Sequence, residues 1–257
     1  GGDGNDTIDG KQGRDTVLMG DGNDTYVWDA GEGNDLVIDG QGGADTLRFN
    51  GSGADEVLTA SSDGNLLKIT SDIGNVVFET RGVEILTINA LGGADTITVN
   101  DLSATDVETV NINLGVAAAG DGAADAVVVN GANTVDVISI SGSGGSATLL
   151  WLSVAVAITY AEPGHDTLTI NSAAGADLVS ASALADTSIH LTINGGAADD
   201  ILVGSQGNDT INGEDGDDLI LGGNGNDTLD GGANTDTIDG GPGIDTAVNG
   251  EFVINVP

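Results

Sequence analysis

The sequence predicts an all-β protein, built as a parallel β-roll or β-helix solenoid of short stacked strands. Three observations lead to this fold class. Glycine-rich nonapeptides recur near both ends of the 257-residue chain, and each ends in a strand-like triplet. Glycine fills 43 positions while aromatic residues make up 3%, so the core must be thin. The acids are mostly aspartate, which favours turns, rather than glutamate, which favours helices.

Residues 195–248, hereafter the C-terminal array, contain six consecutive nonapeptides without an insertion. They read GGAADDILV, GSQGNDTIN, GEDGDDLIL, GGNGNDTLD, GGANTDTID and GGPGIDTAV. Position eight is apolar, and position six is aspartate: Asp200, Asp209, Asp218, Asp227, Asp236 and Asp245. Each nonapeptide is therefore a glycine-rich turn followed by a short strand, whose apolar side chain points inward while its neighbours point outward.

Residues 1–58 contain six similar nonapeptides with small insertions between them. They read GGDGNDTID, GKQGRDTVL, MGDGNDTYV, AGEGNDLVI, GQGGADTLR and NGSGADEVL, and their sixth positions are Asp6, Asp15, Asp24, Asp35, Asp45 and Asp55. Two nonapeptides form one coil, so we expect loops n and n+2 to stack on the same edge. In the C-terminal array this places Asp200, Asp218 and Asp236 on one edge. It places Asp209, Asp227 and Asp245 on the other.

The twelve nonapeptides resemble the G-G-x-G-x-D-x-U-x repeat of the RTX, haemolysin-type calcium-binding proteins. The resemblance implies a parallel β-roll with calcium between successive loops, held by backbone carbonyls and the aspartate carboxylate. Met19, Ala30 and Asn50 replace the first glycine of the pattern, and Ala198 and Asn234 replace the fourth. Hard oxygen ligands without histidine or cysteine also favour Ca²⁺ over transition metals. We therefore expect several Ca²⁺ ions as the cofactor.

The candidate metal ligands extend beyond the twelve sixth-position aspartates. Aspartates at similar places between the two repeat regions join them: Asp95, Asp125, Asp166 and Asp177. Third-position side chains and fourth-position glycines complete the set: Asp3, Asp21, Asp215, Asn224, Gly4, Gly22, Gly207, Gly216 and Gly225. No catalytic residue is expected, and we predict that the chain is not an enzyme.

The charge balance leads to the same cation. The chain has 41 acidic and 5 basic residues, a formal net charge of −36 at pH 7. This charge disfavours binding to nucleic acid, whose phosphates need Lys and Arg, and to an anionic membrane. The apolar tract at residues 147–161 is too short to span a bilayer as a helix, so no membrane insertion is expected. Carboxylates about 5 Å apart repel by roughly 1 to 3 kcal/mol each, which predicts that folding requires calcium.

Residues 59–194, hereafter the middle segment, contain sparser repeats and predict a wider β-helix that continues the rolls at both ends. The strings DTITVN, DAVVVN and DTLTIN end in Asn100, Asn130 and Asn171, and asparagines at fixed turns are expected to stack. Residues 149–160 indicate a pair of strands buried on both faces. Residues 249–257 indicate a terminal cap strand.

Other chemistry receives little support from the sequence. The histidines, His165 and His190, lack the further ligands or nucleophile that a zinc or catalytic site would need. Asp217 and Asp218 could suggest a glycosidase pair, but adjacent strand residues point to opposite faces. Three aromatic side chains at repeat positions are predicted to pack in the core: Tyr26, Trp28 and Phe49.

The predicted organisation is an N-terminal RTX roll (1–58), a wider segment (59–194), a C-terminal RTX roll (195–248) and a cap strand (249–257). It favours a calcium-binding, secreted β-solenoid with a structural, surface-layer, filament or adhesive role. We expect it outside a bacterial cell or on its surface, exported by type I secretion. Self-association into filaments or a surface layer is expected because open strand edges recruit further strands.

Two other classes of function remain open at this point. The chain could be the calcium-binding C-terminal module of a larger exported enzyme or toxin. A β-helix enzyme acting on polysaccharide is the weaker alternative, because the acidic surface would repel uronates and the sequence indicates no basic cleft.

Overall fold

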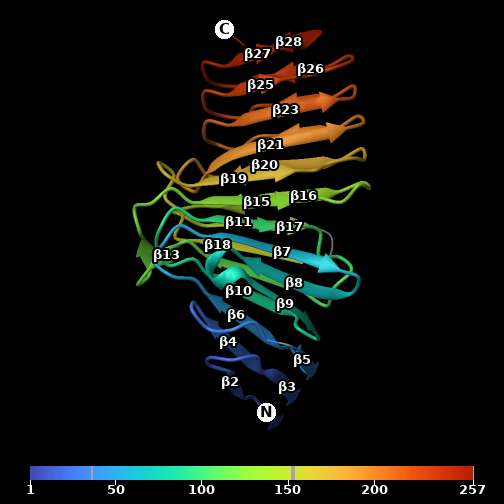
Figure 1. Cartoon of the computed structure of the whole chain (residues 1–257). Helices are drawn as coiled ribbons and strands as arrows, with labels where there is room; N and C mark the ends of the chain where they lie inside the picture. The colour runs from blue at the N-terminus through green and yellow to red at the C-terminus, as the bar shows by residue number, and fades with distance from the viewer. Residues whose placement is uncertain (36, 152–153, 257) are drawn as a thin grey trace. The chain divides into compact units, whose positions relative to one another are not determined.

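The computed structural model of the chain describes residues 1–35, 37–151 and 154–256. The chain forms two compact units. The N-terminal unit comprises Gly1–Asp125 and Ser153–Tyr160, and the C-terminal unit comprises Ala126–Leu152 and Ala161–Pro257. Each unit is all-β and contains two sheets in which most strand pairs are parallel (Figure 1). The predicted fold class is confirmed.

The N-terminal unit has a first sheet of order β1-β3-β5-β9-β8-β7-β11 and a second of order β2-β4-β6-β10-β12-β18. The strands of the first sheet are β1 (Gly2–Asp3), β3 (Thr16–Asp21), β5 (Val37–Gly42), β7 (Val57–Asp63), β8 (Leu66–Ser71), β9 (Val76–Arg81) and β11 (Thr96–Val99). Those of the second are β2 (Thr7–Asp9), β4 (Thr25–Asp29), β6 (Thr46–Asn50), β10 (Ile85–Asn89), β12 (Thr109–Asn113) and β18 (Val154–Thr159). The remaining elements are the antiparallel pair β13 (Gly115–Val116) and β14 (Ala119–Gly120), and the short 3₁₀ helix η1 (Ile73–Asn75).

The C-terminal unit has a first sheet of order β15-β19-β21-β23-β25-β27 and a second of order β17-β16-β20-β22-β24-β26-β28. The first sheet consists of β15 (Ala126–Asn130), β19 (Thr167–Asn171), β21 (His190–Ala197), β23 (Thr210–Asp215), β25 (Thr228–Asp230) and β27 (Thr246–Val248). The second consists of β16 (Val137–Gly142), β17 (Ala147–Trp151), β20 (Leu178–Leu184), β22 (Ile201–Val203), β24 (Leu219–Leu221), β26 (Thr237–Asp239) and β28 (Phe252–Ile254).

The first four strands of the C-terminal array each pair in parallel with the strand two nonapeptides later, as β23 and β25 do in Figure 1. Ile211 on β23 is in register with Leu229 on β25, and Leu202 on β22 with Ile220 on β24. All four side chains are fully buried. The eighth positions therefore form the two inward rows of a thin core, and the predicted coil of two nonapeptides is confirmed.

Aromatic side chains thicken the core of the N-terminal unit. Trp28 on β4 and Phe49 on β6 are stacked, with ring centroids 4.4 Å apart, and Phe78 on β9 lies 6.2 Å from Trp28. Tyr26 is also fully buried. The prediction that Tyr26, Trp28 and Phe49 pack in the core is confirmed.

Antiparallel strand pairs interrupt the parallel coils at two places. β8 pairs antiparallel with both β7 and β9, and β17 pairs antiparallel with β16. On β17, Leu149 is buried whereas Leu150 is 57% exposed, and Tyr160 after β18 is 38% exposed. The prediction that residues 149–160 are buried on both faces is therefore wrong for the described residues of that range, outside which residues 152 and 153 lie. A hairpin laid on one face of the core leaves its other face to solvent, and its side chains alternate accordingly.

Asparagine side chains connect successive strands of the first sheet in the C-terminal unit. The amide of Asn171 donates to Asn130 Oδ1, Asn194 to Asn171, and Asn212 to Asn194, each at 2.7 Å. The predicted stacking of Asn130 and Asn171 is confirmed, while Asn100 lies in the other unit. In the part of the chain that the structure describes, no helix is long and apolar enough to cross a membrane.

Residues 252–254 of the predicted cap strand form β28, which pairs in parallel with β26. Phe252, Val253 and Ile254 are all exposed, so this strand adds backbone pairing without adding an inward side chain to the core.

Candidate calcium sites

The sixth-position carboxylates form hydrogen-bonded ladders along two edges of each unit. We define edge 1 as the row of loops that lead into the second sheet, and edge 2 as the row that leads into the first. On edge 1 of the C-terminal unit, the backbone N–H of each sixth residue donates to Oδ1 of the next at 2.7–2.9 Å, in the order Asp136, Asp177, Asp200, Asp218 and Asp236. On edge 2, the order is Asp209, Asp227 and Asp245, at 2.9 Å. The predicted stacking of loops n and n+2 is confirmed.

The N-terminal unit repeats this ladder. On edge 1, the N–H of Asp6 donates to Asp24 at 2.7 Å, and that of Asp24 to Asp45 at 2.8 Å. The next acceptor is Glu84, whose Oε2 lies 2.6 Å from the nitrogen of Asp45. On edge 2, the N–H of Asp15 donates to Asp35 Oδ1 at 3.0 Å, and separately the N–H of Asp95 donates to Asp125 Oδ1 at 2.8 Å.

We call each residue whose carboxylate accepts or extends the ladder at a sixth position a rung. The second carboxylate oxygen of most rungs is buried and has no hydrogen-bond partner among the described residues. This holds for Oδ2 of Asp15, Asp24, Asp45, Asp95, Asp177, Asp200, Asp218, Asp227, Asp236 and Asp245. An ionised carboxylate in such a place costs several kcal/mol unless a cation or a donor compensates it. Each of these oxygens therefore needs a positive partner that the protein itself does not provide.

In the C-terminal array, these oxygens converge with backbone carbonyls beside the first glycine of the repeat. A Cβ placed on Gly213 would lie 2.3 Å from Asp218 Oδ2 and 2.4 Å from the carbonyl oxygen of Gly231. The same convergence of carboxylate and carbonyl recurs at Gly195, Gly204, Gly222, Gly231 and Gly240. A carboxylate oxygen of repeat n thus meets a carbonyl oxygen of repeat n+2. Flexible, oxygen-only donor sets suit Ca²⁺, so the residues present fit this ion.

Comparison with protein families agrees with this geometry. The family model of the RTX calcium-binding nonapeptide repeat (4 copies) matches residues 1–26, 194–229 and 212–247. These segments are RTX repeats. A comparison with curated proteins gives no match. RTX repeats bind Ca²⁺ in general, and in this chain they present the buried carboxylate and carbonyl oxygens just described. The resemblance inferred from the sequence is confirmed.

Fourth-position glycines let neighbouring RTX loops approach closely. Gly22 has φ +131° and Gly225 has φ +118°, in the left-handed region that favours glycine. A Cβ on Gly22 would lie 2.4 Å from the carbonyl oxygen of Gly4, and one on Gly225 would lie 2.3 Å from that of Gly207. Gly216 also has a positive φ, +153°. The predicted fourth-position glycines therefore lie in the loop stack, each contributing backbone rather than a side chain.

The predicted third-position side chains lie apart from the buried carboxylates. Asp3, Asp21, Asp215 and Asn224 are all exposed. Their backbone does take part, because the carbonyl of Asp21 accepts the N–H of Gly4 at 2.6 Å. The Asn224 amide donates to Gln206, the third residue of the RTX loop before it on edge 2. The structure thus leaves these four side chains at the surface, whereas most sixth-position carboxylates are buried.

One repeat lies one residue away from its predicted frame. Asp55 is exposed, and its Oδ1 accepts the N–H of Ala94 at 2.9 Å, as a fifth-position residue would. Glu56 is 5% exposed, and its N–H donates to Asp95 Oδ1 at 2.8 Å. The placement of Asp55 at the sixth position is therefore wrong. Asn50 ends β6 rather than beginning the loop, which shifts the repeat by one residue.

Other carboxylates occupy ladder positions that the sequence analysis missed. They are Glu56, Glu84, Asp136 and Glu251, and Glu251 Oε2 accepts the N–H of Asp236 at 2.7 Å. A pattern that requires aspartate at position six does not detect a glutamate in the same role. Asp136 had a usable signal: it follows GANTV, in the same place as the other sixth residues.

A second ladder at the fifth positions was also missed. The N–H of Asp217 donates to Asp199 Oδ1, and that of Thr235 to Asp217 Oδ1, both at 2.9 Å. On edge 2, the N–H of Asn226 donates to Asn208 Oδ1 at 2.7 Å. These bonds run opposite to those of the sixth positions, so adjacent loops are joined in both directions. The signal was the frequent Asn or Asp directly before the sixth residue.

The four aspartates of the middle segment that were predicted as metal ligands are each buried at 2% exposure: Asp95, Asp125, Asp166 and Asp177. Asp95 and Asp177 are ladder rungs with an unpartnered Oδ2. Asp125 accepts the N–H of Asp95, and Asp166 Oδ2 accepts the N–H of Glu162 at 2.7 Å. These four residues thus occupy sixth positions, although their loops differ from the RTX pattern.

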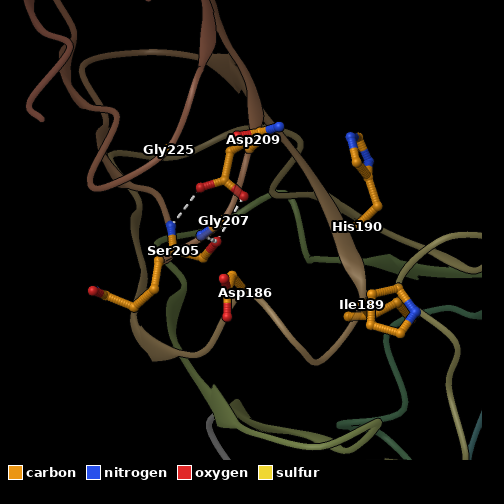
Figure 2. Close-up of a pocket in the computed structure, with 10 residues that line it drawn as sticks. Asp186, Ile189, His190, Ser205, Gly207, Asp209 and Gly225 are labelled. Atoms are coloured by element: carbon orange, nitrogen blue, oxygen red, sulfur yellow. Dashed lines mark hydrogen bonds between the residues drawn. The ribbon is translucent and has the colours of Figure 1, made fainter. Parts of the chain in front are cut away.

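Protein donors compensate the carboxylate of Asp209. Ser205 donates its backbone N–H to Oδ2 at 2.6 Å and its hydroxyl to Oδ1 at 2.8 Å (Figure 2). A cavity of about 330 Å³ adjoins this carboxylate, and Asp186 and His190 also line it. The loop with Asp186 precedes Asp209 on edge 2 and lacks the RTX pattern, so Asp209 is the first rung of its ladder.

Burial raises the pKa of four of the rung carboxyls to well above the ordinary value of aspartate. Loss of water raises the pKa of Asp200, Asp209 and Asp227 to about 6, and that of Asp95 to about 7. Backbone hydrogen bonds partly oppose this rise, and neighbouring carboxylates add to it for Asp95, Asp200 and Asp227. Without a cation, these groups hold a proton more tightly than a carboxyl in water does.

An acidic cluster lies outside the ladders. Carboxylate oxygens of Asp9, Asp29 and Glu32 lie within 4.8 Å of one another. Asp9 pairs with Lys11, and Glu32 Oε2 accepts the N–H of Asp29 at 3.0 Å. Asp29 Oδ1 accepts the side-chain amide of Asn50 at 2.7 Å, so each of the three members already has a positive partner or a donor.

Proposed function

We propose that this chain is a calcium-dependent β-solenoid that folds on binding several Ca²⁺ ions outside the cell and serves a structural, surface-layer, filament or adhesive role. The observation that carries the proposal is the row of buried, unpartnered Oδ2 atoms on both edges, which in the C-terminal array lie beside a backbone carbonyl of a neighbouring coil. Bound cations would compensate these oxygens and join successive loops.

The distribution of basic residues supports a cation from solution. All five Lys and Arg residues lie within residues 11–81. The C-terminal unit therefore has neither Lys nor Arg, although its edges carry the longest ladder. In a cytosol low in calcium the carboxylates would repel one another, which would keep the chain open for export. Secretion from a bacterium agrees with the usual occurrence of RTX repeats.

An apolar row on the outer face supports a role in contact with other surfaces. On the second sheet of the C-terminal unit, Val137, Leu178 and Ile201 are in register on adjacent strands. They point outward and are 51%, 37% and 43% exposed. Burial of such a row against another molecule would be favourable by roughly 25 cal/mol per Å². This favours a surface or assembly protein.

Calcium titration tests the proposal. The purified chain in EDTA is titrated with CaCl₂ while far-UV circular dichroism records β-structure, and calorimetry records the number of ions bound. We expect a cooperative, reversible gain of β-structure with several ions bound per chain. Mg²⁺ should replace Ca²⁺ poorly, because it demands octahedral geometry and dehydrates reluctantly. A spectrum and melting temperature unchanged by EDTA would refute calcium-dependent folding.

A further inference from the structure

Two sixth-position carboxylates receive donors from aromatic side chains on other strands. They are Asp35 in the N-terminal unit and Asp136 in the C-terminal unit. Asp35 is 6% exposed and Asp136 is fully buried. Neither has the unpartnered oxygen found in most other rungs of the ladders.

In the Asp35 loop, both donors come from β4. The hydroxyl of Tyr26 donates to Asp35 Oδ2, and Trp28 Nε1 donates to the carbonyl oxygen of Gly33 at 3.1 Å. Both side chains are fully buried and lie on the second sheet, whereas the loop leads into the first. The side chains therefore cross the core and engage a carboxylate and a carbonyl, the two kinds of oxygen that calcium would use in an RTX loop.

In the Asp136 loop, the aromatic donor comes from the hairpin strand β17. Trp151 Nε1 donates to Asp136 Oδ1, and the backbone N–H of Ala132 donates to Oδ2, both at 2.9 Å. Trp151 is 3% exposed. Both carboxylate oxygens thus have a donor, so the desolvation cost of the carboxylate is met without a cation.

We propose that protein donors take the place of calcium in these two loops and hold them closed in the calcium-free chain. The donors are Tyr26 and Trp28 in the Asp35 loop, and the Ala132 N–H together with Trp151 in the Asp136 loop. At Asp136, Trp151 occupies Oδ1, which in other rungs accepts the N–H of the preceding coil, and the Ala132 N–H occupies Oδ2. An N–H or O–H hydrogen aimed at an oxygen occupies the direction from which a cation would approach. This inference rests on the proposed function, since it divides the loops of one calcium-dependent chain into two kinds. Loops with unpartnered oxygens should open on chelation, while those of Asp35 and Asp136 should stay closed.

The chain carries a built-in reporter of this difference. It has two tryptophans, and each donates a hydrogen bond to one of the two loops in question. Tryptophan emission therefore follows the closed loops, while far-UV circular dichroism follows β-structure throughout the chain. The variants Trp151→Phe and Trp28→Phe leave Trp28 and Trp151, respectively, as single reporters.

The test compares the two signals during chelation with EDTA. We expect a partial loss of β-structure while the emission maximum of each single-tryptophan variant stays in the range of a buried indole. A red shift of both emission maxima in step with the loss of β-structure would overturn the inference. If calorimetry detects no calcium binding, the proposed function fails and the inference fails with it. If calcium binds but both emission maxima shift to the red in step with the loss of β-structure, the inference fails while the proposed function stands.

Removal of one hydroxyl sharpens the test. In the Trp151→Phe background, Tyr26→Phe should leave the Trp28 emission unchanged in calcium, which reports folding, and should make it red-shift in EDTA. The matched control is Tyr160→Phe, because Tyr160 is 38% exposed and lies outside both loops. It should leave the emission in EDTA unchanged. If Tyr26→Phe behaves like this control, the Tyr26 hydroxyl does not hold the loop. If Tyr26→Phe does not fold, the proposal is decided by the emission of the two single-tryptophan variants that keep Tyr26.

Discussion

The two oxygens of a rung carboxylate have different partners. Asp218 Oδ1 accepts the N–H of Asp200 at 2.8 Å, which connects two coils whatever ion is present. Asp218 Oδ2 is buried beside the carbonyl oxygen of Gly231, where only a cation or a proton compensates it. The same side chain thus stabilises the ladder through one oxygen and destabilises the calcium-free fold through the other.

This division predicts that Asp218→Asn changes stability in opposite directions with and without calcium. Asparagine keeps Oδ1 as the acceptor for Asp200 but removes the charge. In EDTA at neutral pH it should raise the free energy of unfolding, because a buried, uncompensated charge is lost. In saturating calcium it should lower it, because an anionic ligand is lost. Urea unfolding under both conditions measures the two effects.

Asp218→Ala is the matched control for that prediction. It also removes the acceptor, so the N–H of Asp200 is left buried without a partner, at a cost of about 1–3 kcal/mol. It should therefore be less stable than Asp218→Asn under both conditions. A stabilising effect of Asn in calcium as well as in EDTA would contradict the role of Oδ2 as a ligand.

The raised pKa values predict how pH affects the calcium-free chain. The pKa of Asp200 rises from 3.8 to about 6 in the fold, and Asp209 and Asp227 behave alike. Between these values the folded state binds more protons than the unfolded one, so stability falls as pH rises through this window. In EDTA the chain should be more stable at about pH 4.5 than at about pH 7.5. Thermal unfolding in EDTA across this range checks the sign, and a rise of the melting temperature with pH would contradict it.

At the scale of the element, an RTX nonapeptide combines a turn without room for side chains and a strand with one inward residue. The Cβ position of Gly213 is already crowded by two oxygens from different coils. The three-residue strand β24 that follows buries Ile220 alone. One such element contributes little core by itself, so its stability depends on the coils above and below it.

Gly213→Ala should therefore destabilise the array. Its Cβ would lie within 2.4 Å of both Asp218 Oδ2 and the carbonyl oxygen of Gly231, so one of the two oxygens must move. Overpacking of this kind costs about 1–3 kcal/mol, and calcium affinity should fall with it. Gly164→Ala is the control, since nothing lies within 4 Å of its Cβ position. Urea midpoints in calcium that are equal for the two variants would contradict the crowding argument.

At the scale of the whole chain, charge and apolar surface oppose each other. The net charge of −36 keeps copies of the chain apart. The outward row of Val137, Leu178 and Ile201 in the C-terminal unit favours contact with another surface. Calcium bound along the edges would lower the repulsion without covering this row.

Self-association should therefore increase with calcium and reverse on chelation. Ile201→Asp should reduce it, because a charge would interrupt the apolar row. Thr228→Asp, an exposed position on β25 of the first sheet, adds the same charge elsewhere and should reduce it less. Light scattering at millimolar calcium measures both variants. A monomeric parent chain at high concentration would remove the filament proposal and favour a calcium-binding module of a larger protein.

The sequence by itself determined the repeat and its consequences. Glycine at the turn, aspartate at position six and an apolar residue at position eight recur with one spacing. That spacing fixes which loops share an edge and which side chains enter the core. Asp200, Asp218 and Asp236 were placed together on this ground alone, and the hydrogen bonds among them agree. Local periodicity suffices here because each coil contacts only its neighbours.

The tertiary structure alone decided which carboxylates lack a partner. Tyr26 reaches Asp35 from the opposite sheet, and Trp151 reaches Asp136 from a hairpin strand. It also decided that Glu56 rather than Asp55 is the rung, because β6 extends through Asn50. These outcomes depend on contacts across the core and on where a strand ends. Neither follows from the spacing within a repeat, because such contacts join residues from different strands of the folded chain.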